Sequence, residues 1–156
     1  MSGTSKYLSL TVLVLALVSV LWGSVFVYQG ISKANMVKEA MRIEKVTYGL
    51  NEAAVARGEV IDSAEKAKEV ADVVSEHRRS IASTYQDLLA GGKYDPTNPK
   101  HLTYAQALNM ENYLYLGVLA LGVTDIATAI GVFMVFTGVA LGATGITLLK
   151  LTGRTT

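Results

Sequence analysis

Few residues in this chain have the types and spacing that catalysis requires. Of the two histidines, His77 and His101, neither has an HxxH or HExxH partner, so a metal site has little support. The chain has no cysteine, which excludes thiol catalysis, disulfides and thiolate zinc sites. It also lacks a phosphate-binding glycine loop and a GxSxG nucleophile motif. We therefore expect a protein that is not an enzyme and that holds no metal and no cofactor.

Asp125 separates two functional classes. It is the single acidic residue in the apolar stretch 113–149, and an acid at mid-bilayer is costly and usually marks an ion or proton path. If the membrane span is centred on 114–136, Asp125 lies at its middle and is a candidate intramembrane polar site. If the span is 126–149, Asp125 lies at the interface as a cap or an interhelical hydrogen-bonding group. Lys150, which closes the apolar run, favours the second placement.

The loop 91–102 is a candidate docking site for a partner. It contains both prolines of the chain, and the Tyr-Asp-Pro and Asn-Pro sequences predict a rigid, extended conformation. Loops of this kind often bind partners, and Tyr94, Pro96 and His101 are the residues that we expect to do so. The alternative is a turn that merely connects two helices.

Small side chains recur every seven residues in both apolar stretches. Seven residues is close to two helical turns, so each series lies on one stripe where helix backbones can approach closely. We expect the two stripes to face each other or a neighbouring subunit; the alternative is that glycine is simply frequent in membrane helices. The series are Ser9, Ala16 and Gly23 in the first stretch, and Gly117, Thr124, Gly131, Gly138 and Gly145 in the second, where Gly142 completes a GxxxG with Gly138.

The small-residue stripes and Asp125 lie in two long apolar stretches, which we expect to form the helices that position them. Residues 7–29 fit one crossing of a ~30 Å hydrocarbon core, and residues 113–149 exceed one crossing. The first run is about twice the length of a signal-peptide core and no small-x-small cleavage site follows it, so we expect a retained anchor. The sequence thus predicts an all-α, two-span integral membrane protein.

Orientation rests on the ends of the chain. The tails, residues 1–6 and 150–156, carry basic residues and no acid. We expect both tails in the cytoplasm, the protein in the cytoplasmic membrane, and the central domain outside it. The basic-residue rule is indecisive, because basic residues also crowd the inner end of the first span: Lys33, Lys38, Arg42 and Lys45.

Residues 30–112 form the predicted extramembrane domain, which has helical periodicity and no strand alternation. A first amphipathic helix is expected over 33–57, with Ser32 as its N-cap and Gly58 as its stop. A second is expected over 62–90, opened by Asp62 with Glu65 in a capping-box-like pair.

The second helix carries an apolar seam that Arg78 interrupts. Thr103 and Gln106 form a capping box that is expected to open the last helix. Glu111 and two asparagines near it place polar groups on a helix that soon becomes apolar, and such groups need partners.

Two arrangements of the domain follow. In one, helix 33–57 runs away from the membrane and helix 62–90 runs back toward it. The loop 91–102 then has to extend away from the membrane again to the start of the last helix, which gives three helices. In the other, slightly preferred, 33–57 lies along the membrane interface and the remaining helices form a hairpin.

Three functions are compatible with these features. The leading hypothesis is a small, non-catalytic accessory or structural subunit of a larger membrane complex, which packs through its glycine-striped helices against other membrane-protein subunits or against itself. The second is a homo-oligomeric ion or proton channel that uses Asp125. The third is a membrane sensor or signalling module, weakened by a short C-terminal tail. Because basic residues alternate with acidic ones, we expect no nucleic acid as partner. The two apolar stretches predict a lipid bilayer as partner.

Overall fold

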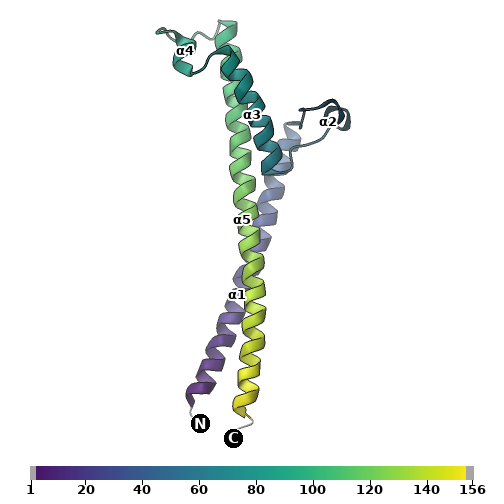
Figure 1. The fold of residues 1–156 in the computed structure, drawn as a ribbon, viewed down its shortest axis with the longest axis vertical. Coiled ribbons are helices and arrows are strands. Elements are labelled where there is room, and N and C mark those ends of the chain that lie inside the picture. The colour runs from purple at the N-terminus through teal and green to yellow at the C-terminus, as the bar shows by residue number, and fades with distance from the viewer. Residues whose placement is uncertain (1–2, 154–156) are drawn as a thin grey trace. The chain divides into compact units, whose positions relative to one another are not determined.

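The computed structural model describes residues 3–153, of which 82% are helical, and no strand occurs among them. The prediction of an all-α fold is therefore confirmed. Two long helices begin and end the described chain, and three shorter helices come between them in the sequence (Figure 1). Their bounds are α1 (Gly3–Ile43), α2 (Glu52–Arg57), α3 (Ala64–Ile81), α4 (Tyr85–Leu89) and α5 (Pro99–Gly153).

The chain divides into two compact units. The helix-pair unit contains the described residues up to Ala34 and from Val123 onward, and the central unit is Asn35–Gly122. Both α1 and α5 are long and apolar enough to cross a membrane, and only 11% and 17% of their most apolar windows are buried. A core helix of a soluble protein would be mostly buried, so these helices differ from that class.

The first helix is longer than expected. The predicted break before residue 33 is wrong, because α1 continues through Gly30 to Ile43 and Ser32 caps nothing. Residues 33–43 are mainly good helix formers and contain no proline, so nothing local stops the helix there. Both expected arrangements of the central domain included a separate helix at 33–57, and that part of each is wrong. The contacts between α3 and the first part of α5 agree with the hairpin of the second arrangement.

A non-helical segment follows α1. Its sequence, Val-Thr-Tyr-Gly at 46–49, favours extended backbone, and Thr47 forms an antiparallel bridge with Val60. The side chain of Asn51 then caps α2 by accepting a hydrogen bond from the Ala54 amide at 2.8 Å. The helix stops at Gly58, as predicted, in the left-handed conformation that glycine adopts without strain (φ 59°).

The predicted helix 62–90 is two helices. Ser63, and not Asp62, caps α3 by accepting from the Lys66 amide at 3.2 Å. That helix ends at Ile81, where extended backbone follows, and Thr84 caps α4 by accepting from the Asp87 amide at 3.1 Å. A second good capping residue so close to Ile81 allows the chain to turn and restart.

The last helix begins four residues earlier than expected. The predicted capping box at Thr103 is wrong, because α5 starts at Pro99 and the Asn98 carbonyl oxygen Oδ1 accepts from the Lys100 amide at 2.9 Å. Proline is well suited to the first helical position, since its fixed φ matches the helix and it has no amide to satisfy. The Thr103 hydroxyl instead donates to the Pro99 carbonyl inside the helix.

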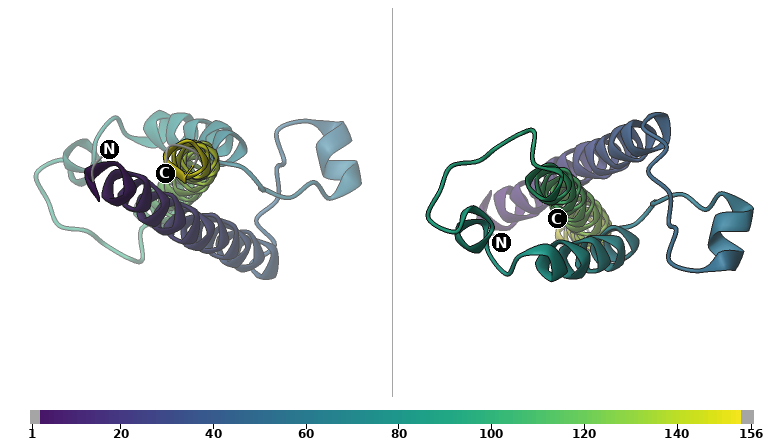
Figure 2. Two further views of the ribbon diagram at one scale, coloured as in Figure 1. Left: turned by 90° about the horizontal axis from the view of Figure 1, so that it is seen from below. Right: turned by 90° about the horizontal axis from the view of Figure 1, so that it is seen from above.

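The core of the central unit lies where α1, α3 and α5 meet. Met41, Ile61, Ala67, Ala71 and Leu114 are buried together, and the alanines let α3 approach α5 closely. A Cβ at Gly117 would clash with the Met41 methyl group, so the glycine makes room for that side chain. In Figure 2, α2 and α4 lie to opposite sides of the α3 and α5 segments of this unit.

Candidate functional site

The central unit contains a buried ion pair. Arg78 on α3 donates from Nε to Glu111 Oε2 on α5 at 2.6 Å, and each residue is 8% exposed. The Arg78 Nη1 also donates to the Tyr104 hydroxyl at 2.6 Å, and its guanidinium lies 5.1 Å from the centroid of that ring. Tyr104 is 1% exposed. The three side chains thus tie α3 to the first part of α5.

The electrostatics keep this pair ionised. The hydrogen bond from Arg78 lowers the pKa of Glu111, against a smaller raising effect of burial, and Ser75 adds a second hydrogen bond that lowers it. The same contact raises the pKa of Arg78. A carboxylate held charged in this way is a poor proton donor or acceptor at neutral pH, so we assign the cluster a structural role.

The sequence marks each of Arg78 and Glu111 as unusual, but it does not predict that they pair. Arg78 interrupts an apolar seam, and Glu111 lies on a helix that becomes apolar; each feature signals a buried group that needs a partner. The two residues are 33 positions apart, and only the register of α3 on α5 brings them together.

The proline-containing loop is organised by His101. Its Nδ1 accepts a hydrogen bond from the Asp95 amide at 3.0 Å, and its ring stacks on Tyr94 with the centroids 5.6 Å apart. His101 is 9% exposed, Tyr94 is half-buried and Pro96 is exposed. Hydrogen bonds from the Thr97 side chain and amide lower the pKa of Asp95. Of the three predicted docking residues, the structure therefore brings Tyr94 and His101 together and leaves Pro96 apart.

The small-residue stripes meet within the helix-pair unit. A Cβ at Gly23 would lie 2.7 Å from the Gly131 carbonyl oxygen, and one at Gly131 would lie 2.7 Å from both the Gly23 oxygen and the Val27 amide. Atoms do not pack at such distances, so only glycine allows the helices to be this close.

The same contact extends along both helices. A Cβ at Gly138 would lie 2.8 Å from the Ala16 carbonyl oxygen, and one at Gly145 would lie 2.8 Å from the Leu13 side chain. A Cβ at Gly142 would lie 3.8 Å from the Ala16 Cβ, an ordinary contact. Ser9 and Thr124 are buried as well. The Ser19 hydroxyl on α1 donates a hydrogen bond to the Met134 carbonyl on α5 at 2.7 Å.

Gly117 belongs to the central unit. It contacts Met41 there, as described above.

Asp125 points away from this contact. It is exposed, between Val123 and Ile126, which are 64% and 61% exposed. Its neighbour Thr128 donates to the Thr124 carbonyl in the same helix and not to Asp125. Across residues 3–153, no ion pair involves Asp125.

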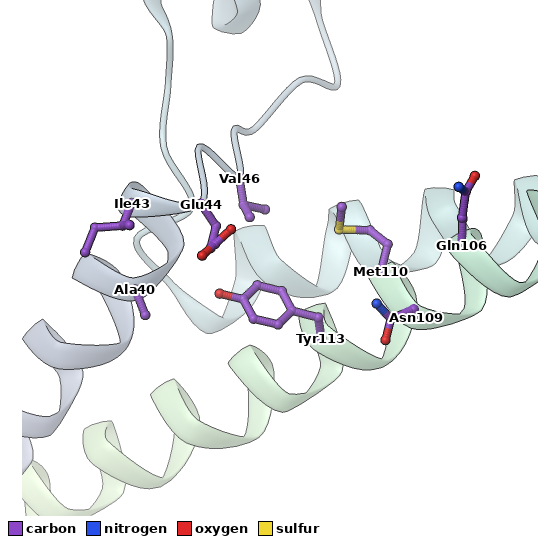
Figure 3. Close-up of a pocket in the computed structure, with 8 residues that line it drawn as sticks. All are labelled: Ala40, Ile43, Glu44, Val46, Gln106, Asn109, Met110 and Tyr113. Carbon is purple, nitrogen blue, oxygen red and sulfur yellow. The ribbon is translucent and has the colours of Figure 1, made fainter.

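An open groove of about 710 Å³ lies in the central unit between the end of α1 and α5 (Figure 3). We call it the α1–α5 groove. Its apolar walls are Ala40, Ile43, Val46 and Met110. Its polar residues are Glu44, Gln106, Asn109 and Tyr113. The predictions made from the sequence did not include this groove, because it depends on where α1 ends.

No known protein family, curated protein sequence or solved structure matches this chain. Within the described part of the chain, no three His, Asp or Glu residues gather as a metal site would require.

Proposed function

We propose that this chain is a two-pass membrane protein that serves as a non-catalytic accessory subunit of a larger integral-membrane complex. The observation that carries the proposal is the close contact of the glycine stripes in the helix-pair unit, where Gly23 and Gly131 meet backbone to backbone. Such contacts are typical of helices that associate inside lipid, where apolar burial gives little drive.

Exposed apolar side chains on the same helices support a bilayer environment. Leu17 and Trp22 on α1 are 60% and 58% exposed, and Phe133 and Phe136 on α5 are both 71% exposed. Large exposed apolar side chains of this kind are unfavourable in water and favourable against lipid or another apolar helix. The glycine faces of α1 and α5 pack against each other, so they are not available to a partner. Neighbouring subunits would instead contact the large exposed side chains on these helices.

The central unit supports a structural role. The Arg78–Glu111 pair and Tyr104 fix α3 on α5, and the His101 contacts order the loop that precedes α5. A rigid helical domain on two spans is what an accessory subunit needs to present a surface to its partners. We place both tails in the cytoplasm and this unit outside the cytoplasmic membrane.

Native mass spectrometry of the tagged, full-length protein tests the proposal. The protein would be extracted gently from its own host membranes. We expect reproducible, stoichiometric masses that include larger, different subunits. A Phe133→Ser, Phe136→Ser variant, which changes the exposed surface, should lose those subunits, whereas Gly122→Ala, where added atoms meet open space, should retain them. Recovery of the chain alone in a single homo-oligomeric mass would overturn the proposal.

A homo-oligomeric ion or proton channel is the second candidate, and the exposure of Asp125 favours it. A carboxylate between two exposed apolar residues gains by facing the interior of an oligomer rather than lipid. Proton flux into liposomes that contain the purified protein separates the candidates. A channel predicts flux that Asp125→Asn abolishes with the fold intact, and an accessory subunit predicts none from either protein.

A further inference from the structure

The α1–α5 groove has the dimensions and composition of a site for a small ligand. Its volume of about 710 Å³ falls within the ~300–1,000 Å³ of typical small-molecule sites. Ile43 and Met110, on opposite walls, are 64% and 43% exposed, so their apolar surface is available to a ligand. Burying that surface would provide an apolar contribution to binding.

Unused polar groups converge on the same space. Within residues 3–153, the side chains of Glu44, Asn109 and Tyr113 make no hydrogen bond and no ion pair. Figure 3 shows the Glu44 carboxylate, from the turn that follows α1, beside the hydroxyl end of Tyr113, from α5. A few convergent polar groups in an apolar groove are what fixes the orientation of a bound ligand.

The charge of the groove selects the ligand class. Glu44 is the single ionised residue among those that line it, so a cation is preferred to a neutral molecule or an anion. The face of an aromatic ring such as that of Tyr113 also attracts cations, and organic ammonium ions in particular, through its quadrupole. Carboxylate, aromatic ring and apolar walls together match an ammonium group on an apolar body.

We infer that the α1–α5 groove binds a small organic ammonium ion whose apolar part is about the size of an aromatic ring. The ammonium lies between the Glu44 carboxylate and the Tyr113 ring, and the apolar part contacts Ile43 and Met110. This inference goes beyond the accessory role and stands whether or not the chain belongs to a larger complex.

Methionine methyl NMR of the full-length protein in maltoside micelles tests the inference. The chain has five methionines, of which Met110 lines the groove and Met134 lies in the helix-pair unit. The probe is benzyltrimethylammonium, and phenylmethanesulfonate is the anion of similar shape. We expect the probe to shift the Met110 signal saturably and to leave the Met134 signal in place, while the anion shifts neither.

Three groove variants and one control variant identify the contacts. Glu44→Gln should weaken binding about threefold or more, because an exposed ion pair contributes modestly. Glu76→Gln, an exposed carboxylate on α3 outside the groove, should bind as the unmodified protein does. Tyr113→Phe should retain binding and Tyr113→Leu should lose it, since the ring face and not the hydroxyl holds the cation.

Retention of the other methionine signals shows that each variant is folded. A linear shift without saturation overturns the inference, as do equal responses to the cation and the anion. Unchanged affinity in Glu44→Gln overturns it as well.

Discussion

Arg78 and Glu111 are buried charged side chains in a unit whose core cluster consists of apolar residues. Removing charges from water is costly, and the cost is offset here by two hydrogen bonds and the contact with Tyr104. The consequence is asymmetric. Loss of both charges is tolerable, whereas loss of one leaves the other buried without a partner.

Arg78→Leu should therefore destabilise the central unit by about 3 kcal/mol. Hydrogen exchange measured by mass spectrometry should show the protection of α3 amides falling by roughly a hundredfold. Arg79→Leu, at the exposed neighbouring position, is the control and should leave protection almost unchanged. The double variant Arg78→Leu, Glu111→Leu should recover most of the loss. A double variant as unstable as Arg78→Leu would contradict this account of the pair.

The Glu111 carboxylate also makes the stability of the central unit depend on pH. Its pKa is lowered in the folded state below the ordinary value of 4.5, so its contribution is complete above about pH 4.5. That contribution is lost as the pH falls through the folded-state pKa. We expect the unfolding temperature, followed by circular dichroism, to fall as the pH is lowered below about 4.5. Glu111→Gln should start lower at pH 7 and fall less, and Glu76→Gln should keep the original slope. Parallel curves for Glu111→Gln and the unmodified protein would exclude Glu111 as the cause.

At the scale of the elements, the ends of the helices are what the sequence predicts least well. Ser32 and Thr103 are good capping residues that cap nothing, whereas Ser63 and Asn98, equally good, begin α3 and α5. Capping preferences are local and worth about 1 kcal/mol, so packing decides which of several candidates is used. The non-helical segment after α1 does have a local signal, in the β-branched and aromatic residues at 46–48.

Spacing along one helix is predictable, and pairing between helices is not. The seven-residue repeat identifies the small-residue face of each long helix from the sequence. It does not say that Gly23 lies against Gly131, because many registers bring small residues together. For the same reason, the Arg78 contact and the α1–α5 groove could not be predicted. Each depends on where a helix ends or on how it is registered against another.

The register of the helix pair leads to a crosslinking prediction. The Cβ of Ala16 lies 3.8 Å from the position of a Cβ at Gly142, which is near the average separation in a disulfide. Ala16→Cys with Gly142→Cys, in a chain without other cysteines, should therefore oxidise within one molecule. Intact mass and non-reducing gel mobility would detect the disulfide.

Ala16→Cys with Ala140→Cys is the control for this crosslink. Residue 140 lies on another face of α5 and is exposed, so this pair should stay reduced under the same conditions. If the Ala16→Cys, Gly142→Cys protein forms covalent dimers instead, the stripe faces a second copy of the chain.

At the scale of the whole molecule, the proposed two crossings of a membrane would place the two ends of the helix-pair unit on opposite sides. The proposed orientation puts Lys6 in the cytoplasm and Lys93, in the loop before α5, outside. Both side chains are exposed lysines without an ion pair among the described residues, so they are matched positions for labelling.

Lys6→Cys and Lys93→Cys, each in the cysteine-free chain, should respond differently to a membrane-impermeant maleimide. In intact host cells the reagent should modify Lys93→Cys, and it should modify Lys6→Cys only after the membrane is opened. Leu17→Cys, near the middle of the first apolar stretch and 60% exposed on its helix, should resist the reagent in both states because lipid would surround it. The reverse pattern for the two lysine positions would invert the orientation and leave the two-pass arrangement standing. Labelling of all three positions in intact cells would contradict the proposal that the chain spans a bilayer. The exposed apolar surface of α1 and α5 would then have to be covered by protein.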